Sequence, residues 1–120
     1  MENDRIVQQK SRRFAIRIVH LYRYLCDTKK EYVMSRQVLR CGTSIGANLA
    51  EAECSYSRKE FLTKTYIAFK ESAETLYWLD LLYETEYLTA EQYRSLSTDC
   101  RELYRLLSSI TRTVRDEPIQ

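Results

Sequence analysis

The stretch CGTSIGANLAEAE, residues 41–53, contains both glycines of this 120-residue chain, Gly42 and Gly46, four positions apart. The residues around them favour helix, and a glycine inside a helix costs about 1 kcal/mol relative to alanine. Two glycines on one helix therefore need a structural reason. Either another backbone packs very close to them, or the helix begins or bends there.

The rest of the chain is rich in helix-forming residues and poor in turn residues. Only one proline accompanies the two glycines, whereas a β fold needs turn residues at each hairpin. Alanine, leucine, glutamate, lysine and arginine are plentiful, and all of them favour helix. A chain of this length has room for one hydrophobic core. We therefore expect one all-α domain over residues 1–120.

Two helix starts are predicted by capping boxes, one at Ser57 with Glu60 and one at Thr89 with Gln92. After the second box, apolar residues recur every three or four positions, which predicts a helix with one buried seam. The seam consists of Tyr93, Leu96, Cys100, Leu103, Leu107, Ile110 and Val114. The helices are predicted at about residues 5–27, 35–54, 58–85 and 90–115. Their short connections predict an antiparallel, up-down four-helix bundle. In the first helix, the residues expected to face the core are Phe14, Ile18, Tyr22, Leu25 and Cys26.

The third predicted helix carries apolar residues on more than one face, which indicates burial on more than one side. In a bundle of this size the second side would contact another subunit, with Tyr66, Phe69, Tyr77 and Trp78 as candidate oligomer contacts. The chain has ten tyrosines, a residue type enriched at protein interfaces. The alternative is that most of these tyrosines lie half-exposed at the edges of the bundle.

Charge is unevenly distributed along the chain. The formal net charge is +2, but residues 1–40 carry ten basic and four acidic side chains, a balance of +6. Residues 41–92 carry four basic and nine acidic side chains, a balance of −5. Such asymmetry is compatible with a nucleic-acid surface and equally with contacts between helices or subunits.

The sequence offers no motif for enzyme, metal or cofactor chemistry. The four cysteines form no C-x-x-C pair and are not closely spaced with the only histidine, His20, so zinc is not expected. We expect reduced core thiols in a cytoplasmic protein, since disulfide frameworks belong to small secreted chains. The N-terminal residues lack the apolar segment of a signal peptide, and no apolar run is long enough to cross a membrane. We expect no enzymatic activity and no small-molecule substrate.

A polar set occupies one side of the second predicted helix: Arg40, Ser44, Asn48 and Glu51, at intervals of 4, 4 and 3. One interpretation is a structural hydrogen-bond network, with Arg40 paired to Glu71 or Glu74 of the third helix. The alternative is a ligand or nucleotide pocket. A carboxylate-bridged metal site is not favoured, because such sites use two Glu-x-x-His motifs.

Four arginines of the last predicted helix form one line at spacings of 7, 4 and 7: Arg94, Arg101, Arg105 and Arg112. We call them the arginine line. A line of this kind is commonly just a solvated helix face, but repeated around an oligomer it would form a belt that attracts phosphates. Arg13 and Arg17 of the first helix are candidates to extend it.

These motifs together resemble the four-helix proteins encoded in intervening sequences of bacterial 23S ribosomal RNA genes. The resemblance covers about residues 11–115 and is carried by SRQVLRCGTSIGANLAEAE (35–53), SRKEF (57–61) and IAFKESAETLYWLDLL (67–82). The matching motif positions are Arg40, Ser44, Ile45, Asn48, Ala50, Glu51, Ser57, Glu60, Phe61 and Ala68. Ala52 departs from the pattern, because many relatives have glycine there.

The resemblance implies a homopentameric, ring-like assembly of bundles with no attached reaction. It also suggests, through distant retroelement relatives, that a basic ring surface holds nucleic acid. The expected function is therefore a non-enzymatic oligomeric scaffold that binds RNA or DNA through the arginine line. The alternative is a protein-interaction or structural assembly module with no nucleic-acid role.

Overall fold

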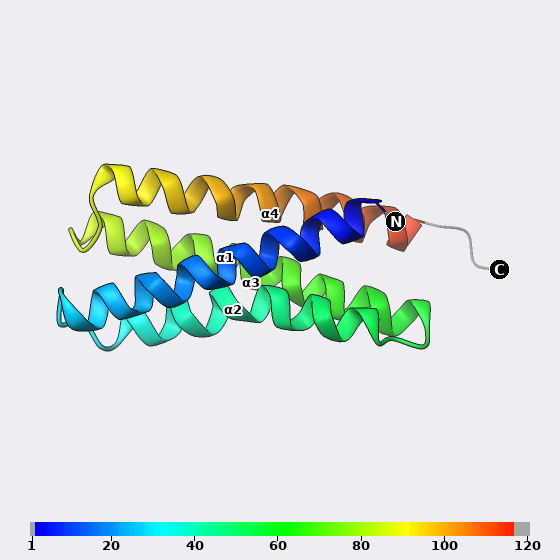
Figure 1. The fold of residues 1–120 in the computed structure, drawn as a ribbon. Coiled ribbons are helices and arrows are strands. Elements are labelled where there is room, and N and C mark those ends of the chain that lie inside the picture. Colours follow the sequence, from blue (N-terminus) through cyan, green and yellow to red (C-terminus); the bar gives the residue numbers. More distant parts are fainter. Residues whose placement is uncertain (1, 117–120) are drawn as a thin grey trace.

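The computed structural model describes residues 2–116, apart from the side chain of Asn3, as four helices joined by short connections (Figure 1). They are α1 (Glu2–Asp27), α2 (Met34–Glu53), α3 (Arg58–Glu84) and α4 (Ala90–Asp116). No strand occurs within this part of the chain. The prediction of an all-α fold with four helices is confirmed. Met1 and residues 117–120, which the predicted domain includes, lie outside the described residues.

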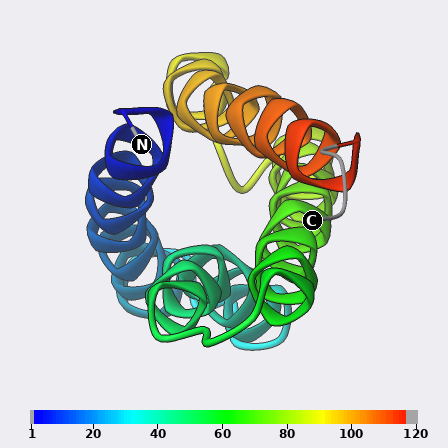
Figure 2. The same cartoon turned by 90° about the vertical axis from the view of Figure 1, so that its right-hand side faces the viewer.

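The helices run alternately up and down, and each packs against its neighbours in the chain (Figure 1). Helix α4 closes the bundle against α1, as the end-on view in Figure 2 shows. The molecule is elongated, with extents of 53 × 22 × 20 Å. This shape exposes one long outer face of every helix. The ring-like assembly of several such bundles stays a prediction.

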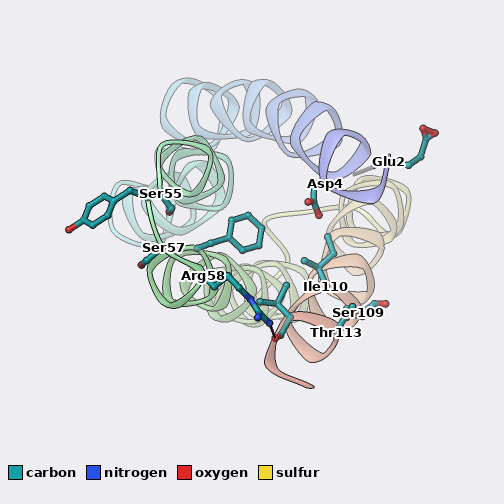
Figure 3. Close-up of a pocket in the computed structure, with 11 residues that line it drawn as sticks. Glu2, Asp4, Ser55, Ser57, Arg58, Ser109, Ile110 and Thr113 are labelled. Atoms are coloured by element: carbon teal, nitrogen blue, oxygen red, sulfur yellow. Dashed lines mark hydrogen bonds between the residues drawn. The ribbon is translucent and has the colours of Figure 1, made fainter. Parts of the chain in front are cut away.

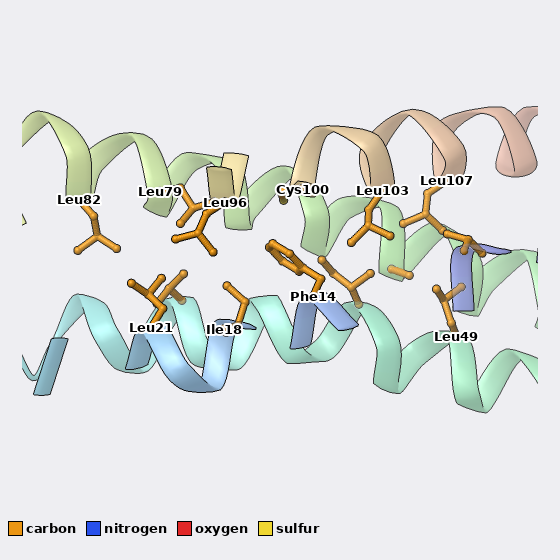
Figure 4. Close-up of a cluster of buried hydrophobic side chains, with 14 of the residues drawn as sticks. Phe14, Ile18, Leu21, Leu49, Leu79, Leu82, Leu96, Cys100, Leu103 and Leu107 are labelled. Carbon is orange, nitrogen blue, oxygen red and sulfur yellow. The ribbon is translucent and has the colours of Figure 1, made fainter. Parts of the chain in front are cut away.

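A single apolar core runs along the bundle axis, with side chains from all four helices pointing inward (Figure 4). The predicted seam of α4 is confirmed, because Leu96, Cys100, Leu103, Leu107 and Ile110 are all buried. Its two end members, Tyr93 and Val114, are half-buried and pack against this core.

Helix α1 contributes three of the predicted core residues, namely Phe14, Ile18 and Leu25. Tyr22 and Cys26, also predicted to face the core, are only half-buried, and Leu21 is buried instead. The register of the apolar face of α1 is therefore rotated slightly from the predicted one.

The two glycines are explained by the close approach of α1, since α2 continues through both of them. A β-carbon at Gly42 would come within 2.8 Å of Ile18 Cγ1, and one at Gly46 would meet Ser11 Oγ at 3.3 Å and the Ser11 carbonyl oxygen at 3.6 Å. Of the two explanations open at the sequence level, close packing is correct. The Ile18 side chain fills the space beside Gly42, whereas Gly46 lies against both the side chain and the backbone of Ser11.

Both predicted capping boxes contribute hydrogen bonds. Thr89 and Gln92 cap reciprocally: the Thr89 N–H donates to Gln92 Oε1 at 2.9 Å, and the Gln92 N–H donates to Thr89 Oγ1 at 3.1 Å. At α3, Ser57 Oγ accepts from the Glu60 N–H at 3.1 Å. Each box ties the loop before a helix to its first turn.

The start of α2 is stabilised by a carboxylate that the sequence analysis did not identify. Glu31 is buried, and its carboxylate accepts the backbone N–H groups of Val33, Met34 and Ser35 at 2.7–3.1 Å. A negative charge at a helix N-terminus also interacts favourably with the helix dipole. The short α1–α2 connection is thereby held in one geometry.

Candidate nucleic-acid interface

The arginine line lies on the outer surface of α4, with all four of its guanidinium groups exposed. Residues three or four apart share a helix face, so the spacing of 7, 4 and 7 keeps the four side chains in one row. Within residues 2–116, Arg94, Arg105 and Arg112 form no ion pair or hydrogen bond through their side chains. Their positive charges are therefore available to an external anion.

Two acidic residues of α4 point away from this row, toward α1. Asp99 accepts from Arg17 Nη1 at 2.7 Å, and Glu102 pairs with Lys10 at 3.2 Å. Arg17 also donates to the Ser95 side chain and carbonyl. Partially exposed ion pairs of this kind add little stability, but they neutralise these carboxylates on the α1 side of α4.

These contacts separate the two candidate extensions of the arginine line. Arg17 lies in the seam between α1 and α4 and is engaged with Asp99, so its position fits a helix–helix contact better than a phosphate contact. Arg13 is exposed and borders a recess of about 120 Å³ that also includes Lys10, Asp99 and Glu102. Neither residue lies in the row formed by the four arginines of α4.

Arg101 is the one member of the arginine line that the protein itself positions. Its guanidinium donates to Ser97 Oγ and to the Tyr93 hydroxyl, each at 3.3 Å. The Tyr93 hydroxyl in turn donates to Asp80 of α3, and the Tyr93 ring stacks on Tyr83 with centroids 4.5 Å apart. Arg101 is therefore tied to the seam between α3 and α4.

A second feature of this seam is a row of three aromatic rings. The centroids of Tyr66 and Phe69 are 6.0 Å apart, and those of Phe69 and Tyr104 are 4.9 Å apart. Lys70 Nζ lies 5.8 Å from the centre of the Tyr66 ring, within range of a cation–π interaction. We call Tyr66, Phe69 and Tyr104 the aromatic row.

The four candidate oligomer contacts do not form one patch. Tyr66 and Phe69 belong to the aromatic row beside α4, whereas Tyr77 and Trp78 pack edge to face with centroids 5.1 Å apart. Trp78 Nε1 donates to Glu74 at 3.0 Å, which places it near the seam with α2. Tyr77 is 58% exposed and Tyr66 is 47% exposed, so each side has one tyrosine open to a partner.

The polar set on α2 makes contacts within the protein. Arg40 bridges α2 to α3, pairing with Glu71 at 3.0 Å and with Glu74. The guanidinium of Arg40, followed by the indole N–H of Trp78, lowers the pKa of Glu74 below its ordinary value. Arg40 has a raised pKa for the same reason. These contacts match the structural interpretation of the set.

The other members of the set are separate from this bridge. Asn48 Nδ2 donates to the Ser44 carbonyl oxygen at 2.9 Å, which is a contact within α2. Glu51 pairs with Lys64 at 2.7 Å, and the carboxylate raises the pKa of that lysine. The six residues of the predicted network therefore form several separate local contacts along the α2–α3 seam.

Comparison with known proteins identifies the family. The model of the 23S rRNA-intervening sequence protein family matches residues 3–109. The chain belongs to this family. A crystal structure from Bacteroides thetaiotaomicron, of a protein with unknown function from the S23 ribosomal protein family, is 54% identical. The match covers 92% of this chain and 98% of that chain, with a TM-score of 0.90. No curated protein matches the chain.

This member of the 23S rRNA-intervening sequence protein family also has a pocket of about 650 Å³ at one end of the bundle (Figure 3). Asp4 and Ile110 point into the opening, and the Arg58 guanidinium donates to the Val114 carbonyl at its edge (Figure 3). No residue of the arginine line, the aromatic row or the polar set lines this pocket. None of the helices described in this family member is both long and apolar enough to cross a bilayer.

The cysteines of this family member occupy different environments. Cys41 and Cys100 are buried, and desolvation raises the pKa of Cys41 to about 11 and that of Cys100 to about 12. The prediction of core thiols is wrong for Cys54, which is exposed at the end of α2, and Cys26 is half-buried. Residues 2–116 contain no cluster of three or more His, Cys, Asp or Glu side chains arranged to hold a metal ion.

Two residues of the candidate interface were not identified from the sequence, namely Lys70 and Tyr104. Tyr104 lies just outside the apolar seam of α4, and nothing in the spacing of that helix shows that it meets Phe69 of α3. Lys70 follows Tyr66 by four positions, the separation at which side chains on a helix are neighbours. The contact of Lys70 with the Tyr66 ring could therefore have been predicted from the sequence.

Proposed function

We propose that this protein is a non-enzymatic, oligomeric binding protein that holds RNA or DNA along the arginine line of α4. The observation that carries the proposal is that Arg94, Arg105 and Arg112 are exposed and unpaired within residues 2–116. The nearby carboxylates of Asp99 and Glu102 pair with basic residues of α1 instead. Such a row contacts phosphates without reading sequence. Its affinity depends on the number of arginines engaged and on salt.

Assembly matters to this proposal because one bundle is only weakly basic. A net charge of +2 gives little long-range attraction, whereas copies of the arginine line on a homo-oligomer would act together. We propose self-association through the outer face of α3, with Tyr77 as the exposed contact, and a pentameric ring by family resemblance. The expected location is the cytoplasm, where nucleic acid is accessible.

The second candidate function is a protein-interaction module with no nucleic-acid role. The exposed apolar and aromatic side chains of α3, Tyr66, Ile67 and Tyr77, favour it. Exposed aromatic residues are typical of protein interfaces. In this case the arginine line would be an ordinary solvated helix face.

Fluorescence anisotropy with a labelled single-stranded RNA of about 20 nucleotides tests the two functions. We expect binding at 50 mM salt that weakens steeply by 200 mM. Arg105→Glu with Arg112→Glu should reduce affinity at least tenfold, because the change reverses two charges that form no hydrogen bond or ion pair within the described residues. The matched control is Arg23→Glu with Arg36→Glu, on exposed positions of α1 and α2. Equal losses in both pairs, or no binding by the unaltered protein, would contradict the proposal.

A further inference from the structure

The aromatic row is an unusual feature for a solvated seam between two helices. Tyr66, Phe69 and Tyr104 follow one another from α3 to α4, with centroid distances of 6.0 and 4.9 Å. Phe69 and Tyr104 are half-buried, which fixes the row against the bundle, and Tyr66 is 47% exposed at its outer end. The row therefore presents one open ring supported by two packed ones.

Cations lie on both sides of the aromatic row. On α3, Lys70 Nζ is 5.8 Å from the centre of the Tyr66 ring. On α4, Arg101 comes three positions before Tyr104 and Arg105 directly after it, and both arginines are exposed. The Arg101 guanidinium is held at another place on the α3–α4 seam, by Ser97 and by the Tyr93 hydroxyl beside Asp80, fourteen positions along α3 from Tyr66. The aromatic row thus has Lys70 beside Tyr66 at one end, and Arg105 next in sequence to Tyr104 at the other.

We propose that the ligand of this surface is single-stranded nucleic acid, with an unpaired base stacking on Tyr66 and neighbouring phosphates bound by Lys70 and Arg105. This inference rests on the proposed function and names its substrate class. Base faces are available in a single strand, whereas in a duplex they are covered by neighbouring base pairs. Aromatic platforms beside cationic grooves are the general means of binding single strands without reading sequence.

The charges around the row favour a nucleic acid over a second protein copy. The centres of protein interfaces are depleted of charged residues, and lysine in particular is rare there. Here Lys70 lies beside the exposed ring and the exposed Arg105 follows Tyr104 at the other end of the row, so a second copy covering the row would have to desolvate like charges. A polyanion would neutralise them instead. Tyr77, farther along α3, remains the proposed oligomer contact.

The test compares a labelled 12-nucleotide oligo(dT) with a 12-base-pair duplex, using the full chain in 50 mM salt. Tyr66→Leu removes the ring but keeps an apolar side chain, Tyr66→Phe keeps the ring, and Tyr32→Leu changes an exposed tyrosine of the α1–α2 connection. We expect the unaltered protein to prefer the single strand. Tyr66→Leu should weaken single-strand binding by about 5-fold to 150-fold, the range for loss of one stacked base. Tyr66→Phe and Tyr32→Leu should bind normally.

Three other results would overturn the inference, and they are distinguishable. If both ligands bind equally and Tyr66→Leu changes neither, the arginine line binds phosphates but the aromatic row does not stack bases, and only this inference fails. If neither ligand binds, the proposed function fails with it. If Tyr66→Leu lowers the particle mass in light scattering, Tyr66 is a protein contact, and the second copy is the occupant of the row.

Discussion

Gly42 of α2 lies directly against the side chain of Ile18 of α1, so closely that a β-carbon at position 42 would be 2.8 Å from Cγ1 and 2.9 Å from Cγ2. Both residues are buried in the core. Carbon atoms that are not bonded prefer separations of about 3.5–4.0 Å. The interaxial distance of α1 and α2 is therefore set by the absence of a side chain at this position.

We predict that Gly42→Ala destabilises the fold. Alanine gains about 1 kcal/mol of helix propensity, but crowding in a packed core typically costs about 1–3 kcal/mol, and Ile18 meets the new methyl group with its branched end. A net loss of about 1–2 kcal/mol is expected in urea unfolding. At Gly46, where the nearest atom is 3.3 Å away, the same substitution should cost less.

A double-mutant cycle isolates the contact from other effects of the glycine. Ile18→Ala removes the three crowding atoms, Cγ1, Cγ2 and Cδ1, and leaves a cavity that the alanine at position 42 would partly fill. The double variant should therefore be at least as stable as Ile18→Ala alone. Simple additivity of the two losses would contradict a direct contact between the two positions.

We predict that the ion pair of Arg40 and Glu74 stabilises the protein at neutral pH and not in acid. Because the pKa of Glu74 is lowered by folding, its contribution is complete above the ordinary pKa near 4.5 and is lost as the pH falls through the folded value. Glu74→Gln should cost about 1 kcal/mol or less at pH 7, since Arg40 is half exposed and solvent screens the pair.

Urea unfolding followed by Trp78 fluorescence measures this difference at pH 7 and at pH 3. Trp78 is the only tryptophan and donates to Glu74, so Arg40→Gln, which leaves that contact in place, should be measured as well. Glu84→Gln, at an exposed position of α3, is the matched control and should have no effect at either pH. A loss in Glu74→Gln that is equal at pH 7 and pH 3 would contradict the assigned role.

We predict that the four thiols react at very different rates with a thiol reagent at pH 8. Cys54 is exposed and should react first, while Cys41 and Cys100 should react only on unfolding, because burial removes access and raises their pKa to about 11 and about 12. Cys54→Ser should abolish the fast phase. Persistence of that phase in the variant would place another thiol at the surface.

We predict that Tyr77 supports self-association. A lysine at position 77 would place a charge in a face proposed to be covered, so Tyr77→Lys should lower the particle mass in light scattering. Tyr32→Lys, at a similarly exposed tyrosine, is the control. If both variants keep the mass of the unaltered protein, α3 does not make the contact at this residue.

Much of the fold could be predicted from local patterns because helices depend on local signals. The capping box of Thr89 with Gln92 forms both of its hydrogen bonds, and the seam from Leu96 to Ile110 is buried. The pairing of Arg40 with Glu71 and Glu74 was also among the interpretations. The first two follow from residue type and spacing within one helix, and the third from opposite charges on two helices that are neighbours in the chain.

Contacts that depend on how two helices are rotated against each other could not be predicted. The spacing of α1 predicted Tyr22 as a core residue, but Leu21 is buried and Tyr22 is only half-buried. The position of Arg17 beside Asp99 and the meeting of Phe69 with Tyr104 have the same origin. Such contacts follow from packing geometry, which a helical pattern alone does not specify.

The most direct test of the central claim is light scattering on the purified chain, with and without a single-stranded RNA, at 50 and 200 mM salt. The proposal predicts a particle of several 14.3-kDa chains, about 72 kDa for a pentamer, that gains the mass of RNA at low salt and loses it at high salt. A particle of the same size that never gains RNA would contradict the nucleic-acid role. A monomer would contradict the oligomeric scaffold itself.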